Sequence, residues 1–108
     1  MIKLRTANRN DVETLSAIAF SAKAYWGYPS SWLKLWEEYL TVTIEQVQNN
    51  TIFVCELQEK IVGFIGISAE ENLAEIEHLW VLPEFMGRGI GKALFKHALK
   101  WCQANAID

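Results

Sequence analysis

Residues 79–94 are Leu79-Trp80-Val81-Leu82-Pro83-Glu84-Phe85-Met86-Gly87-Arg88-Gly89-Ile90-Gly91-Lys92-Ala93-Leu94. An apolar segment typical of a strand is followed by a proline turn, three glycines at alternate positions and the start of an amphipathic helix. Glycine reaches positive φ without a steric penalty and lets the backbone approach a ligand closely. Because the first amides of a helix carry partial positive charge, this order predicts an anion-binding turn, most simply one for phosphate.

The length and composition predict one domain that spans residues 1–108. Apolar residues make up 51% of the chain, which is enough for a single core, and nothing resembles a linker or a repeat. No apolar run approaches the roughly 20 residues that cross a bilayer, and the N-terminus has no signal-peptide pattern. We therefore expect a cytoplasmic protein with no membrane partner. Cys55 and Cys102 are expected to be reduced core residues.

The charge distribution excludes some partners and suggests another. A net charge of −3 gives no overall field that would attract nucleic acid, so we expect no nucleic-acid partner. Four basic residues nevertheless lie at and just behind the glycine turn, and they fit either an anion-binding turn or a solvated helix face. They are Arg88, Lys92, Lys96 and Lys100.

Hydrophobic patterns before residue 50 predict a strand followed by helices. Residues 2–5 alternate as in a strand, and Asn10 or Asp11 is expected to cap the first helix. A second helix, beginning at Ser30 or Ser31, carries aromatic residues at helical spacing that we expect in the core. Thr43 is the expected cap of a short third helix. The expected core aromatic residues are Trp32, Trp36 and Tyr39.

Hydrophobic patterns after residue 50 predict three strands and a final helix. Residues 51–57 and 61–67 are rich in strand-forming side chains and are separated by three polar residues, which predicts a hairpin. Residues 73–82 form the next strand, and the helix begins at Ile90. The sequence thus predicts an α/β fold with the order β-α-α-β-β-β-α, with the short helix after Thr43 as an optional third helix before the second strand.

The glycine turn does not fit two common phosphate-binding motifs. A Walker loop requires Ser or Thr after its lysine, whereas Lys92 is followed by Ala93. A dinucleotide-binding fingerprint requires a glycine at position 92 or 94 and an acidic residue about twenty positions later. The structural alternative is that the glycines only shape a strand-to-helix turn.

The turn resembles motif A of the GNAT superfamily of acetyl-CoA-dependent N-acetyltransferases, whose hallmark is Gln/Arg-x-x-Gly-x-Gly/Ala. Gly89 and Gly91 match the motif, whereas Met86 replaces the leading Gln or Arg that helps to hold the pyrophosphate. The resemblance implies a mixed, mainly antiparallel sheet flanked by helices, with acetyl-CoA as co-substrate and no metal. The implied co-substrate-binding residues are Leu79, Trp80, Val81, Met86, Gly87, Arg88, Gly89, Ile90, Gly91 and Lys92.

The resemblance covers nearly the whole chain but only the first part of the family domain. Residues 21–28 are similar to the linker that borders the acceptor site, so Tyr25, Trp26 and Tyr28 are candidates for acceptor binding, with core packing as the alternative. The family domain continues with another strand and helix, so this fold is expected to be short at its C-terminal end. We expect a second copy to cover the sheet edge formed by residues 73–82, which makes a homo-oligomer.

Two glutamates on the predicted strand 73–82 are candidates for the general base that acetyl transfer requires. Regular alternation would place Glu75, Glu77, Leu79 and Val81 on one face and His78 on the other. By its distance from the glycine motif, Glu75 matches the catalytic glutamate of some GNAT histone acetyltransferases, so it is the first candidate. Glu77 is the second candidate. The alternative is a pair of solvated carboxylates, and His78 is expected to be a packing histidine.

The resemblance also implies that backbone N–H groups near residues 79–81 stabilise the oxyanion. A tyrosine on a later helix is the general acid in many family members, and no residue of this chain is assigned to that role. The sequence therefore predicts an N-acetyltransferase that transfers acetyl from acetyl-CoA to a primary amine of an unknown acceptor. The alternative is a catalytically inactive GNAT-derived module that binds acyl-CoA or a protein.

Overall fold

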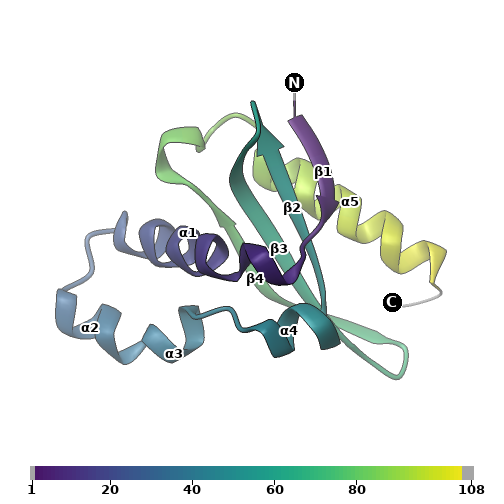
Figure 1. The fold of residues 1–108 in the computed structure, drawn as a ribbon, viewed down its shortest axis with the longest axis horizontal. Helices are drawn as coiled ribbons and strands as arrows, with labels where there is room; N and C mark the ends of the chain where they lie inside the picture. The colour runs from purple at the N-terminus through teal and green to yellow at the C-terminus, as the bar shows by residue number, and fades with distance from the viewer. Residues whose placement is uncertain (1, 106–108) are drawn as a thin grey trace.

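The structure is a computed structural model that describes residues 2–105 (Figure 1). Its strands form one four-stranded antiparallel sheet in the order β1-β2-β3-β4. The strands are β1 (Ile2–Thr6), β2 (Thr51–Leu57), β3 (Lys60–Glu70) and β4 (Leu73–Val81). The helices are α1 (Val12–Ala24), α2 (Ser30–Leu35), α3 (Glu37–Leu40), α4 (Ile44–Asn49) and α5 (Ile90–Ala104), with single 3-10 turns η1 (Arg9–Asp11) and η2 (Pro83–Phe85).

Helices cover both faces of the sheet, which confirms the predicted fold class. Helices α1 to α4 lie on one face and α5 crosses the other (Figure 1). The first core joins Leu15 and Ile18 of α1 to Phe64 of β3, and the second joins Leu94 of α5 to Ile65. Both cysteines are buried free thiols of the second core, as predicted.

The structure corrects two details of the helical segment. Asp11 is the N-cap residue of α1, one of the two predicted positions, but its side chain makes no capping hydrogen bond to α1. The side chain of Asn8 instead caps the 3-10 turn η1 that precedes the helix. The predicted second helix is divided at Trp36 into α2 and α3, and Tyr39 is exposed rather than in the core. Trp32 is also exposed, whereas the predicted cap at Thr43 is confirmed.

A β-bulge interrupts β4 at Glu77. On one side of it His78 pairs with Gly66, and on the other Ile76 pairs with Ile67, so Glu77 has no partner on β3. An extra residue in one strand shifts the alternation of side chains by one position beyond it. Odd-numbered side chains of β4 therefore point to one face of the sheet before the bulge and to the opposite face after it.

The bulge makes the predicted alternation along β4 wrong. Residues directly opposite each other in a sheet share a face, so Glu75 and His78 lie on the face of α1. Leu79 and Val81 lie on the face of α5. The side chain of Glu77 approaches Asn50, just after α4. Neither glutamate shares a face with Leu79 and Val81.

Strand β4 is one of the two outer strands of the described sheet. The N–H of Leu82 donates to the carbonyl of Val62 over 2.8 Å. Because alternate residues of an antiparallel strand bond to the same neighbour, the N–H groups of Leu79 and Val81 point away from β3. No strand among residues 2–105 pairs with this outer edge. Covering of the edge by a second copy remains a prediction.

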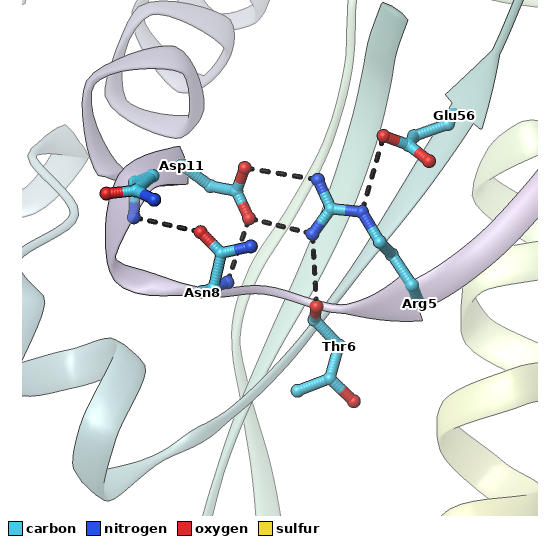
Figure 2. Close-up of polar contacts among 6 residues, drawn as sticks. Arg5, Thr6, Asn8, Asp11 and Glu56 are labelled. Atoms are coloured by element: carbon cyan, nitrogen blue, oxygen red, sulfur yellow. Dashed lines mark hydrogen bonds and ion pairs between the residues drawn. The ribbon is translucent and has the colours of Figure 1, made fainter. Parts of the chain in front are cut away.

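The Arg5 side chain joins β1 to the start of α1 (Figure 2). Its guanidinium donates to both carboxylate oxygens of Asp11, over 2.9 and 3.1 Å, and its Nε lies 3.3 Å from Glu56. Asp11 also accepts the N–H of Asn8 over 2.8 Å. The hydrogen bonds from Arg5 are the main reason that the pKa of Asp11 lies below its ordinary value.

We expect Asp11→Asn to lower the free energy of unfolding by about 1–3 kcal/mol near neutral pH, because it removes the carboxylate that accepts two hydrogen bonds from Arg5 and leaves Glu56 as the remaining charged partner. The contribution of Asp11 is present above its unfolded pKa of 3.8 and is lost as pH falls through the lower folded value. Urea unfolding near neutral and at acidic pH measures both effects. Glu13→Gln, which removes an exposed carboxylate of α1, is the control. Equal stability of the two variants at neutral pH would contradict this assignment.

Candidate functional site

A cleft of about 410 Å³ opens between the end of β4 and the start of α5. Every residue predicted to bind the co-substrate lines this cleft except Arg88. The cleft is also lined by Ala22 of α1, by Trp26 and by Phe85 of η2. The structure thus brings two segments on either side of the proline turn, and part of the α1 region, to one concave surface.

Two glycines have backbone conformations that shape the turn. Gly87 and Gly89 have φ of 80° and 79°, a region that side-chain-bearing residues rarely adopt. A Cβ atom built on either glycine would meet no atom within 4 Å, so the backbone there is open to an approaching ligand. Gly91 has no such φ, and its Cβ would make only an ordinary contact of 3.8 Å with Val81.

The first turn of α5 presents free hydrogen-bond donors to the cleft. The first helical bond of α5 runs from the N–H of Ala93 to the carbonyl of Gly89, over 3.0 Å. The N–H groups of Ile90, Gly91 and Lys92 therefore have no acceptor within the helix, and Gly89 has no side chain to cap them. These amides, the positive end of a 15-residue helix and the Lys92 ammonium favour an anion.

The two candidate bases occupy different places. Glu75 is exposed and lines a separate hollow at the β3–β4 hairpin, about 13 Å along the strand from Leu79 at the usual rise per residue. Glu77 is half-buried and only two residues from Leu79. The Tyr39 hydroxyl donates to the carbonyl of Glu77 over 3.2 Å, and the Asn50 amide lies 3.5 Å from its carboxylate. Neither glutamate lines the cleft itself.

His78 is a buried packing residue with 5% of its surface exposed. Its ring lies 5.6 Å from that of Phe64 and 5.8 Å from that of Tyr39. The indole N–H of Trp80 donates to its Nδ1 over 3.1 Å, which requires an unprotonated Nδ1. Burial lowers the pKa of His78 and so favours the neutral ring.

The structure divides the three aromatic residues predicted to bind the acceptor. Trp26 lines the cleft. The Tyr25 ring packs edge-on against the Trp26 ring, with centroids 5.3 Å apart. Tyr28 instead packs against Trp36, and the Lys23 ammonium lies over both rings at 4.9 and 4.3 Å. Of the three, Trp26 lines the cleft and Tyr25 contacts Trp26, whereas Tyr28 packs against Trp32 and Trp36 of the α2 region.

Comparison with known proteins identifies the family. The sequence pattern of the acetyltransferase (GNAT) family matches residues 15–108. The chain belongs to the GNAT acetyltransferase family. An uncharacterised N-acetyltransferase of Methanocaldococcus jannaschii is 28% identical over 109 residues, which cover 93% of this chain and 47% of that protein. The mycothiol acetyltransferase of Streptomyces griseus is 42% identical over 57 residues, which cover 51% of this chain and 19% of that enzyme.

Solved GNAT structures share the fold. The PaiA N-acetyltransferase of Thermoplasma acidophilum, in complex with coenzyme A, matches with a TM-score of 0.87 at 22% identity, covering 99% of this chain and 75% of that one. A GNAT acetyltransferase of Brucella melitensis, in complex with acetyl-CoA, matches with a TM-score of 0.79 at 19% identity, covering 99% and 71%. The chain spans about half the length, or less, of the curated relatives that it matches.

Residues 2–105 contain neither a membrane-spanning helix nor a grouped set of metal ligands. None of the helices within residues 2–105 combines the length and apolarity needed to cross a membrane. Within the same residues, no three His, Cys, Asp or Glu side chains are grouped so that they could hold a metal ion.

The sequence did not single out several residues that line the cleft or contact Glu77. Phe85, Tyr39 and Asn50 carry no motif that singles them out, because only the fold brings them to the cleft or the bulge. The bulge, in contrast, could have been suspected from the spacing of apolar residues in the sequence. Apolar residues of β4 recur at Ile76 and Leu79, three positions apart, where a regular strand face repeats every two.

We expect the conformation of the turn to depend on Gly89 more than on Gly91, because Gly89 has a positive φ and Gly91 does not. Gly89→Ala should lower the free energy of unfolding by about 1–2 kcal/mol, because alanine is strained at positive φ. Gly91→Ala is the matched control and should leave stability unchanged or raise it by up to about 1 kcal/mol, since alanine is the better helix former. Thermal unfolding followed by circular dichroism measures both, and equal losses would contradict the turn geometry.

Proposed function

We propose that this chain carries the co-substrate site of an N-acetyltransferase that transfers an acetyl group from acetyl-CoA to a primary amine. The observation that supports it most is one cleft joining the free amides of β4 to the glycine turn at the start of α5. The family membership and the two CoA-bound structural neighbours agree with this assignment. No observation favours the alternative of an inactive binding module.

The walls of the cleft suit the two chemically different parts of acetyl-CoA. Ala22, Leu79, Val81 and Ile90 provide apolar surface for the pantetheine arm. The open backbone of residues 87–92 and the unpaired first amides of α5 suit its phosphates. When bound, acetyl-CoA supplies the activated acetyl thioester.

The outer edge of β4 provides hydrogen-bond donors next to the apolar walls. The N–H groups of Leu79 and Val81 point away from β3 and are available to a carbonyl oxygen in the cleft. Donors that are fixed before the reaction stabilise developing negative charge without reorganisation. These two amides are therefore the proposed oxyanion donors.

The geometry favours Glu77 over Glu75 as general base, the reverse of the order inferred from the sequence. Glu77 is half-buried at the bulge, near the cleft, and two neighbouring polar side chains fix its position. Glu75 is exposed and lines the hollow of the hairpin. We propose that Glu77 accepts the proton of the acceptor ammonium, directly or through a water, and that Trp26 and Tyr25 border the acceptor.

The proposal predicts different effects for two conservative variants. Glu77→Gln should lower kcat/KM by about 100-fold, because it removes the base, whereas Glu75→Gln should stay within about threefold of the wild-type value. Release of the CoA thiol, measured across a panel of primary amines, identifies a usable acceptor and then compares the variants. Acetyl-CoA affinity, measured by calorimetry, should be unchanged in both.

The opposite ranking of the two variants would contradict the assignment of Glu77. Saturable binding of acetyl-CoA without amine-dependent release of CoA thiol by the wild-type protein would instead support a binding module.

A further inference from the structure

The cleft lacks a polar side chain at the position where motif A begins. Met86 occupies this position and lines the cleft, half-buried. A thioether is at best a weak hydrogen-bond acceptor and cannot donate to a phosphate oxygen. A phosphorylated co-substrate in this cleft therefore receives no hydrogen bond from this position, which leaves room for a contribution from cationic side chains near the turn.

Two cationic side chains meet at the ring of Phe85, directly before Met86. The Arg88 guanidinium carbon lies 5.2 Å from the ring centroid, and the Lys60 ammonium lies 5.7 Å from it. Phe85 itself lines the cleft. Lys60 is far from this turn in the sequence, and no motif pointed to it.

The fold explains why Lys60 reaches the glycine turn. Gln58 and Glu59 both adopt positive φ, 52° and 66°, which makes a tight two-residue hairpin turn between β2 and β3. Lys60 therefore begins β3 as the partner of Leu57. The hydrogen bond from the Leu82 N–H to the Val62 carbonyl then holds the start of β3 beside the end of β4.

The charge of Lys60 is available to a ligand. Among residues 2–105, the ion pairs within 4.0 Å are those of Arg5 with Asp11 and Glu56. Lys60 is exposed, and so is Arg88. Lys60 lines a groove beside the cleft together with four carboxylates, those of Asp11, Glu56, Glu59 and Glu84. Asp11 and Glu56 are paired with Arg5, and none of the four forms an ion pair with Lys60, so they reduce the local positive potential without occupying the ammonium.

We propose that Lys60 is a further phosphate-binding cation of the acyl-CoA site, in addition to Lys92, and that with Arg88 it compensates for the polar side chain absent at Met86. This inference rests on the proposed function, because it assumes that the cleft holds a CoA ester. It extends the site from the β4–α5 turn to the β2–β3 hairpin. The ammonium contacts the ligand as a point charge, whereas the backbone amides of the turn provide directed hydrogen bonds.

Calorimetric titration with CoA tests the role of Lys60 without any need for an acceptor. Lys60→Gln should weaken CoA binding about three- to tenfold, the range expected for one exposed charge contact to phosphate. Lys60→Arg retains the charge and should bind nearly as the wild type. Lys100→Gln, which removes an equal charge about 15 Å along α5 from its start, should leave CoA affinity within about twofold.

Each outcome separates this inference from the function on which it rests. Equal affinities of Lys60→Gln and Lys100→Gln would overturn the role of Lys60 while leaving the CoA site intact. A loss in Lys60→Arg as large as in Lys60→Gln would overturn the role of its charge. Absence of CoA binding by the wild-type protein would contradict the proposed function first, and the role of Lys60 with it. Unchanged melting temperatures establish that the variants are folded.

Discussion

The outer edge of β4 is the constraint from which the site follows. An antiparallel ladder pairs only alternate residues with a given neighbour, so the N–H groups of Leu79 and Val81 face away from β3. Leu79 is exposed and Val81 is half-buried, so these groups can bond to water or to a ligand, and a ligand that covers them without accepting a hydrogen bond would lose about 1–3 kcal/mol for each amide. The turn at Gly87 and Gly89 then starts α5 so that its unpaired amides join the same cleft. One concave surface thus collects donors from a strand and from a helix.

The bulge at Glu77 determines which acidic group lies near this surface. Without the extra residue, regular alternation would direct Glu77 toward α5 together with Leu79. With it, the Glu77 carboxylate approaches Asn50 on the side of the sheet that α1 to α4 cover. Trp26 follows α1 and lines the cleft from the same region. The acidic group and the aromatic boundary of the cleft therefore come from the same layer, and the anion-binding helix comes from the other.

Local patterns were sufficient to predict the strands, the helix at Ile90, the cap at Thr43 and the glycine turn, because each depends on neighbours within a few residues. The face of Glu75 and Glu77 was not predicted, because a bulge is defined by pairing with another strand. The aromatic segment was predicted only in part. Trp26 reaches the cleft as expected, but Tyr28 turns toward Trp36 and Lys23, a contact that depends on how α2 packs. Lys60 lies near the glycine turn because of the register of the β2–β3 hairpin and the pairing of β3 with β4, and neither can be read from composition.

The central claim is that acetyl-CoA binds between β4 and α5. Titration of isotope-labelled protein with acetyl-CoA, followed by amide chemical shifts in nuclear magnetic resonance, tests it most directly. The account predicts saturable shifts that are largest at Leu79, Val81 and residues 87–92. It also predicts small shifts at the Arg5–Asp11 contact, which joins β1 to the start of α1. No saturable shifts, or the largest shifts away from the cleft, would contradict the account.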